Sequence, residues 1–335
     1  MTVCRSLFLI LMLMVSHLVR AEFVELPKVP DFSVLQTYEE AMHRLFLGRG
    51  EDFKRISTDG GEIDQAYTAL FDGARWFVKI VREDCAECNQ IRFENEWLLK
   101  KSLARYRWLA KVNAQLVLPD RAATFVLNRK QHYILSYPLV PGVTLRALYY
   151  QLYLASPYAL NIKQKTLLRR AFFRYGQVLA LSHFDPKLPA SDSAEMLSRV
   201  VRLHLPDRNG SNEIYDPVTD RIYLVDLADT AQHFGRSVKV NADLQEWLES
   251  LVDIAIDAQA RDGFYCGLSY ECIVHPLKQF TRGYTSSLPL YKRKMVMQMM
   301  GSITAGYLHK VCVSDSQVVS FCPAVSIIEE QFYSY

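Results

Sequence analysis

Two runs of residues, Asp207-Arg208-Asn209-Gly210-Ser211-Asn212 and Ile222-Tyr223-Leu224-Val225-Asp226, carry most of the information in this sequence. Between them, Glu213 to Tyr215 and Arg221 to Val225 alternate polar and apolar residues around a turn, which predicts a β-hairpin. Such a hairpin would return Asp226 to the side of Asn212, where amide and carboxylate oxygens suit magnesium. Asp207, on the same loop as Asn212, is spaced to act as a base toward a hydroxyl. The pattern therefore predicts a site for phosphoryl transfer.

This loop has two other interpretations. Asp, Asn, Gly and Ser are common turn residues, so the hexapeptide taken alone is also compatible with a simple connector. A calcium-binding loop would use alternating oxygen ligands, but its required glycine would fall at Asn212 and its closing glutamate at Val218. The calcium interpretation therefore fails at two positions.

A lysine suited to nucleotide phosphates lies upstream. Ile63 to Leu70 and Arg75 to Val81 are strand-like runs, and the Asp72-Gly73 pair between them predicts a tight hairpin. Lys79 lies within the second run among large apolar residues, so it must either reach the surface or be paired with an acid.

The acidic partner is expected on the next helix. Ile91 to Leu103 has helical spacing of its apolar residues and carries Glu94 and Glu96. We favour Glu96 as the partner of Lys79 and leave Glu94 as the alternative.

In this order, from about Ile56 to about Ser250, the motifs resemble those of the protein-kinase-like superfamily. The Asp-Arg-x-x-x-Asn form is closer to lipid kinases and other atypical kinases than to ordinary protein kinases. Val140-Pro141-Gly142-Val143-Thr144-Leu145 is similar to the Pro-Gly-x-x-Leu segment of the aminoglycoside and choline kinases. The resemblance implies ATP and magnesium, or manganese, as cofactors. It also implies a role for each site residue. Asp207 would be the catalytic base, and Asn212 and Asp226 would be the metal ligands. Lys79 would bind the phosphates with Glu96 as its partner, and Gly60 and Gly61 would contact the nucleotide.

The chain departs from the family pattern in three places. His204 lies three residues before Asp207, not the usual two, so we interpret it as a core or structural histidine. Asp226 is followed by Leu227-Ala228 in place of the usual apolar-glycine pair. Gly60-Gly61 is not part of a spaced glycine triplet, and a β-turn explains the pair nearly as well.

The fold implied is α+β and bilobal. Residues 22–137 are expected to form an N-terminal extension, with a helix over Ser33 to Leu47, and a small lobe built on a mixed β-sheet. Residues 138–335 are expected to form a mainly helical lobe that carries the catalytic loop, with helices over Ile162 to Phe184, Asp243 to Ala260 and Tyr291 to Val311.

The first residues have the layout of a secretory signal. Met1 to Ala21 contains Arg5 and a short apolar core from Leu7 to Val15. That core is too short to span a bilayer, although an uncleaved signal would anchor the chain. We therefore expect a secreted or extracytoplasmic protein without a stable membrane span, cleaved near Ala21.

Charge and cysteines refine this expectation. The formal charge is +3, and removing Arg5 and Arg20 with the signal leaves 37 − 36 = +1, which argues against nucleic acid as a partner. Six cysteines remain, an even number that favours disulfides over zinc in an exported chain. They are Cys85, Cys88, Cys266, Cys272, Cys312 and Cys322.

The one glycosylation sequon, Asn209-Gly210-Ser211, lies inside the predicted catalytic loop. A glycan there would obstruct the site, which favours either a bacterial exported protein or a loop too buried to be modified.

The expected function is transfer of the ATP γ-phosphate to a hydroxyl of a protein, lipid or sugar acceptor. A pseudokinase that acts as a binding or scaffold module is the main alternative, motivated by the missing glycine triplet and the residues after Asp226. A nucleotidyl transferase on the same fold is a third.

Overall fold

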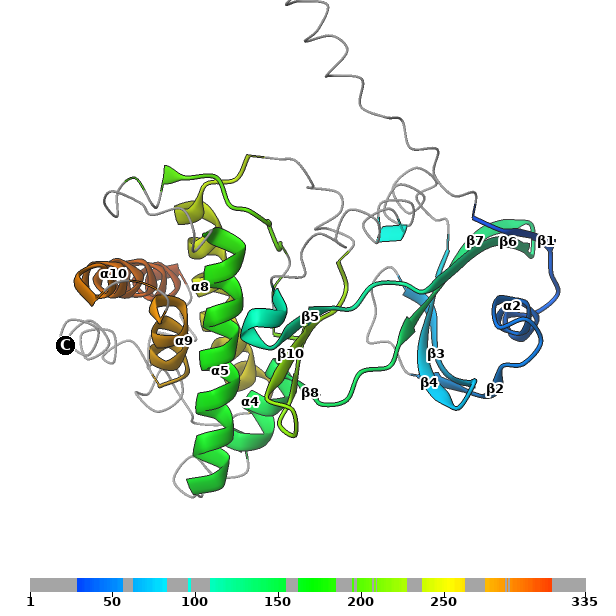
Figure 1. The fold of residues 1–335 in the computed structure, drawn as a ribbon, viewed down its shortest axis with the longest axis horizontal. Coiled ribbons are helices and arrows are strands. Elements are labelled where there is room, and N and C mark those ends of the chain that lie inside the picture. Colours follow the sequence, from blue (N-terminus) through cyan, green and yellow to red (C-terminus); the bar gives the residue numbers. More distant parts are fainter. Residues whose placement is uncertain are drawn as a thin grey trace, which may run out of the picture.

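The computed structural model describes residues 29–56, 63–82, 96–97, 109–154, 162–184, 195, 198–206, 208, 210–227, 237–262, 275–286, 288 and 290–314. In these residues the N-terminal part forms a multi-stranded sheet and the C-terminal part is mainly helical (Figure 1). This mixed α/β architecture is consistent with the bilobal kinase-like fold that the sequence predicts.

The N-terminal sheet has six strands among the described residues, in the order β1-β6-β7-β4-β3-β2. They are β1 (Asp31–Val34), β2 (Glu51–Ile56), β3 (Ile63–Phe71), β4 (Ala74–Arg82), β6 (Arg121–Leu127) and β7 (Lys130–Pro138). β3 and β4 form the predicted hairpin, and its Asp72 and Gly73 both adopt positive φ values, 49° and 74°. Two successive residues at positive φ give the turn a twist that matches the strands, which explains the Asp-Gly pair.

The helix predicted over Ser33 to Leu47 is only partly correct. Asp31–Val34 forms strand β1, which pairs with β6 in parallel, and the helix α2 covers only Tyr38–Leu45. The helix begins where Thr37 Oγ1 accepts a hydrogen bond from the Glu40 N–H at 3.1 Å, an ordinary N-cap.

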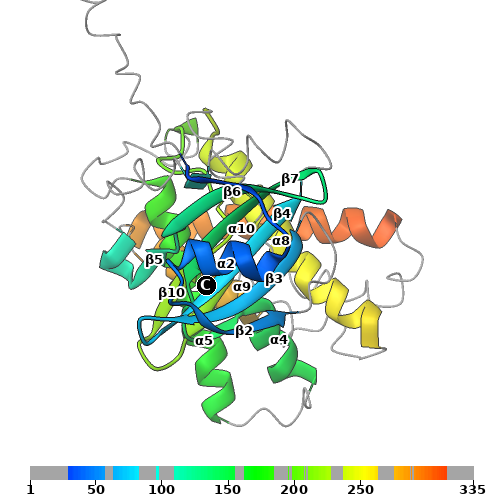
Figure 2. The same ribbon diagram turned by 90° about the vertical axis from the view of Figure 1, so that its right-hand side faces the viewer.

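Helix α2 packs on the face of the sheet that looks away from the helical part (Figure 2). Its buried residues join a core cluster with apolar side chains of β3, β4, β6 and β7, including Phe71, Ile80, Phe125 and Ile134. The N-terminal extension therefore seals one face of the sheet, and the opposite face is left to line the site.

A second, smaller sheet lies between the six-stranded sheet and the helices (Figure 1). Its order is β5-β10-β9-β8, with β5 (Ala114–Leu116), β8 (Val143–Thr144), β9 (Glu213–Asp216) and β10 (Arg221–Leu224). β9 and β10 are the predicted hairpin, and they pair antiparallel with Leu224 opposite Glu213.

The helical part comprises α4 (Leu145–Leu154), α5 (Ile162–His183), α8 (Val240–Asp262), α9 (His275–Thr285) and α10 (Leu290–Ser314). The helices predicted over Ile162 to Phe184, Asp243 to Ala260 and Tyr291 to Val311 are confirmed as α5, α8 and α10. Tyr175, Trp247 and Phe280 are almost fully buried and pack ring against ring in the core that joins α5, α8 and α9. In the described part of the chain, no helix combines the length and the apolar character needed to cross a membrane.

Candidate active site

Lys79 lies in the middle of the six-stranded sheet, on a strand bordered by β3 and β7. Its Nζ is 3.3 Å from Asp226 Oδ1 and 4.0 Å from Glu96 Oε2. The side chains of Lys79 and Glu96 are 13% and 3% exposed, so their charges interact with little screening by solvent. The structure thus brings Lys79 between Glu96 and Asp226, whereas Glu94 lies outside the described residues.

The β9–β10 hairpin brings Asn212 and Asp226 to the same end. Asn212 immediately precedes β9 and accepts a hydrogen bond from the Val225 N–H at 2.9 Å, and Asp226 follows Val225. Asp226 has φ 49°, in the left-handed region that aspartate tolerates better than most residues. The return of Asp226 beside Asn212 is therefore as the alternation of the sequence predicts.

These residues line one cavity of about 290 Å³. Its polar end is formed by Lys79, Glu96, Asn212 and Asp226. The rest is mainly apolar, formed by Phe77, Val117, Tyr137, Pro138, Leu139, Val140, Ile214 and Val225. A cavity with an apolar wall and a few convergent charged groups at one end suits a ligand that is flat and apolar on one side and charged on the other.

Tyr137 is a cavity residue that the sequence did not single out. The residue is 6% exposed, and burial, followed by the negative charge of Glu96, holds the pKa of the phenol well above its usual range. The phenol therefore stays neutral and adds no further negative charge beside Lys79. The signal available from sequence was its place at the end of an apolar strand that leads to Pro138.

Gly142 explains the Pro-Gly segment in physical terms. Its φ is +119°, and a Cβ at this position would lie 2.4 Å from the Tyr215 carbonyl oxygen on β9. Only glycine lets the chain pass this close to the hairpin. Shortly afterwards, the Arg146 N–H at the start of α4 donates to Gly210 O at 2.9 Å, so this segment also contacts the 210–212 loop.

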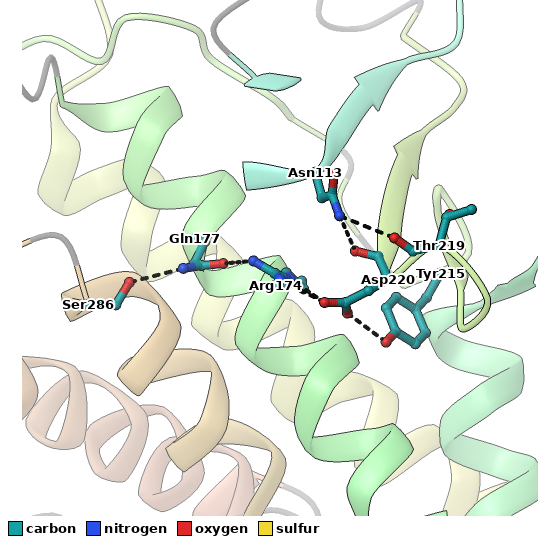
Figure 3. Close-up of polar contacts among 7 residues, drawn as sticks. All are labelled: Asn113, Arg174, Gln177, Tyr215, Thr219, Asp220 and Ser286. Carbon is teal, nitrogen blue, oxygen red and sulfur yellow. Dashed lines mark hydrogen bonds and ion pairs between the residues drawn. The ribbon is translucent and has the colours of Figure 1, made fainter. Parts of the chain in front are cut away.

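The turn of the hairpin is fixed to α5 by a network of hydrogen bonds (Figure 3). Asp220 accepts from Arg174 at 2.6 and 2.9 Å and from the Tyr215 hydroxyl at 2.9 Å. Asn113 Nδ2 donates to the carbonyls of Thr219 and Asp220 at 3.1 and 3.3 Å. The hairpin that carries Asn212 and Asp226 is thus held at its far end as well as at the cavity.

His204 belongs to a buried network, in agreement with its interpretation as a structural histidine. Its Nδ1 lies 2.5 Å from Asp243 Oδ1, and His183 Nε2 lies 2.6 Å from the other oxygen, Oδ2. Burial opposes ionisation of Asp243, but the hydrogen bonds from the two imidazoles outweigh it and lower the pKa of the carboxyl. His204, Asp243 and Glu246 also have ligand atoms within 4.8 Å of one another. Because both Asp243 oxygens are already used by imidazoles, we assign this group to hydrogen bonding and not to a metal.

Several predicted residues lie outside the described part of the chain. They are Asp207, Asn209, Gly60 and Gly61, the signal segment 1–21, and the cysteines other than Cys312, whose backbone is in α10. Asp207 is flanked by Pro206 and Arg208, both of which the structure describes. The roles assigned to Asp207, Gly60 and Gly61 stay predictions.

No protein-family model and no curated protein matches the sequence. Among solved structures, the chain is similar to one described as WaaP in complex with acyl carrier protein, with a TM-score of 0.40 and 16% sequence identity. The alignment covers 90% of this chain and 98% of that chain. Similarity at this level does not identify what this chain binds, so its function has to be inferred from the cavity itself.

Proposed function

We propose that the protein is an exported kinase-like phosphotransferase that moves the ATP γ-phosphate to an acceptor hydroxyl. The observation that carries the proposal is that one cavity is lined by Lys79, which lies between Glu96 and Asp226, and also by Asn212. Phosphoryl transfer depends mainly on positioning and on neutralising phosphate charge, and these groups are suited to both.

The apolar wall suits the nucleoside base. Pro138 and Pro141 have no N–H, and the Leu139 N–H already donates to Arg75 O at 3.0 Å. Within residues 138–141, Val140 is therefore the residue whose N–H donates no hydrogen bond in the part of the chain that the structure describes. Because Val140 lines the cavity, we infer that this N–H donates to an edge of the bound base.

The donor set at the polar end fits magnesium. The Asn212 amide and the Asp226 carboxylate offer the hard oxygen atoms that this ion prefers, and no sulfur or imidazole ligand belongs to the described lining of the cavity. The bound ion would supply positive charge to the phosphates. Lys79 would hold the nucleotide phosphates, Glu96 would orient Lys79, and Asp207 would accept the proton of the acceptor hydroxyl.

Export is part of the proposal and is supported by the sequence of Met1 to Ala21. Disulfides among the six remaining cysteines would follow from that location. The intact mass of protein recovered outside the cytoplasm tests both, because cleavage near Ala21 and each disulfide change it by known amounts. A mass that corresponds to the full reduced chain would contradict both.

Transfer is tested with purified oxidised protein, Mg-ATP, and protein, lipid-headgroup and sugar acceptors. We expect magnesium-dependent formation of ADP and of a phosphorylated product. Replacing Asp207 by asparagine removes the base and is expected to lower the rate about 100-fold or more. A product that carries AMP would identify nucleotidyl transfer, and ADP formation that Asp207→Asn leaves unchanged would contradict the assigned role of Asp207.

A further inference from the structure

We propose that Arg208 is a positioning residue that fixes the two metal ligands relative to each other and to the catalytic loop, and thereby sets the affinity for magnesium. This inference rests on the proposed function. It concerns a residue that donates its hydrogen bonds to backbone carbonyls and is not among the residues that line the cavity.

The guanidinium of Arg208 is surrounded by carbonyl oxygens. The residue is 3% exposed. Its Nε donates to Pro206 O at 3.0 Å, and one terminal nitrogen donates to Asn212 O at 3.3 Å and to Val225 O at 3.2 Å. The other terminal nitrogen donates to Asp226 O at 2.8 Å. Arg208 thus binds the backbone of both metal-ligand candidates directly.

These carbonyls come from three separate points of the site. Pro206 immediately precedes Asp207, Asn212 ends the loop, and Asp226 follows β10, 18 positions after Arg208. A planar fork with donors on each edge can hold several carbonyls in fixed directions. One side chain therefore holds the backbone of both ligand candidates and of Pro206 in a fixed relation.

Glu213 balances the charge of Arg208. Glu213 is fully buried, and its Oε1 is 3.4 Å from the Arg208 guanidinium. Its Oε2 accepts from the Gly210 N–H at 2.8 Å, so the partner of Arg208 also holds the loop. Burial and then the negative charge of Glu213 hold the pKa of the neighbouring Tyr175 phenol well above its usual range.

Because Arg208 holds the backbone of Asn212 and Asp226, we expect it to affect magnesium affinity as well as stability. Residues that orient metal ligands without touching the metal commonly affect metal affinity about 10- to 100-fold when they are changed. A side chain that only stabilised the fold would alter thermal stability without changing the dependence on magnesium. The two roles can therefore be separated by experiment.

The test uses Arg208→Lys in the full chain, which keeps the positive charge beside Glu213 but replaces the fork by a single ammonium group. The measurements are the magnesium concentration that half-saturates binding of a fixed concentration of ATP, and the affinity for ATP in the presence of EDTA. We expect the half-saturating magnesium concentration to rise about 10- to 100-fold. The affinity for metal-free ATP should stay within about twofold.

Arg174→Lys is the matched control. Arg174 also fixes the hairpin, but through Asp220 at the far turn and not through Asn212 or Asp226 (Figure 3). This variant should change thermal stability and leave the magnesium dependence near that of the parent. If Arg208→Lys also changes only stability, the proposed positioning role is wrong.

Two further observations keep the test decisive. The double variant Arg208→Gln, Glu213→Gln removes both buried charges together and is expected to show the same weakened dependence on magnesium, so it replaces the single variant if that does not fold. Parental magnesium affinity in the folded double variant would overturn the inference. A parent protein that binds no Mg-ATP would instead overturn the proposed function on which the inference rests.

Discussion

Replacing Lys79 by methionine is expected to lower phosphoryl transfer by about 100- to 1,000-fold, the usual effect of removing one electrostatic contact from a transition state. Methionine keeps an unbranched apolar stem on β4 but removes the charge that lies between Glu96 and Asp226. The nucleotide phosphates would then face two acids without a neutralising cation from the protein. The measurement is the rate of ADP formation at saturating acceptor and magnesium.

The control for this variant is Lys54→Met. Lys54 lies on β2 of the same sheet and also pairs with an aspartate, Asp52, at 3.0 Å, but its side chain is 64% exposed. Exposed ion pairs contribute little to stability and this one lies away from the cavity, so the rate should stay within about twofold of the parent. A folded Lys79→Met protein that keeps more than about a tenth of the parental rate would contradict the assignment of Lys79.

Replacing Gly283 by alanine is expected to destabilise the protein by about 3 kcal/mol, at the upper end of the usual cost of overpacking. Helices α5 and α9 cross in close contact, and a Cβ on Gly283 would lie 1.9 Å from the Phe173 carbonyl oxygen. Gly176 makes the reciprocal approach, with a Cβ 2.0 Å from Phe280 O. The obstacles are backbone atoms of a facing helix, so relief requires the two helices to separate.

Urea unfolding measures this effect, and Gly306→Ala is its control. Gly306 is also helical, in α10, but a Cβ there would meet nothing within 4 Å. The higher helix propensity of alanine should leave this variant as stable as the parent or up to about 1 kcal/mol more stable. Equal unfolding midpoints for Gly283→Ala and Gly306→Ala would show that the helix crossing does not require glycine.

The parts of the fold that could be predicted from the sequence are those that depend on residues close together in the chain. The β3–β4 and β9–β10 hairpins depend on alternation and on turn residues only a few positions apart, and the structure contains both. The order of strands followed by helices is likewise visible along the chain. Asn212 and Asp226 could be predicted to lie close together because a single short hairpin connects them.

The features that were missed depend on distant partners. The last two residues of β1, Ser33 and Val34, were predicted as helix because their strand character comes from pairing with β6, about ninety positions later in the chain. Arg208 and Glu213 lie in a polar stretch that looks solvent-exposed in sequence, yet both are buried against the backbone of the site. Asp243 is also buried, and its hydrogen-bond partner His183 is 60 positions away in the chain.

The most direct test of the account is the melting temperature of the oxidised protein with and without Mg-ATP, for the parent, Asp226→Ala and Asp72→Ala. Asp72 is the matched control because it has the same φ of 49° as Asp226 but lies at the exposed β3–β4 turn, where it pairs with Arg49. Any backbone strain caused by alanine is therefore common to both variants. Of these two aspartates, only Asp226 lines the cavity.

We predict that Mg-ATP at about 100 times its dissociation constant stabilises the parent and Asp72→Ala by about 2.7 kcal/mol. The corresponding rise in melting temperature should require magnesium and should be lost in Asp226→Ala. No rise in the folded parent at millimolar Mg-ATP, or the same rise in Asp226→Ala, would contradict a magnesium–nucleotide site in this cavity.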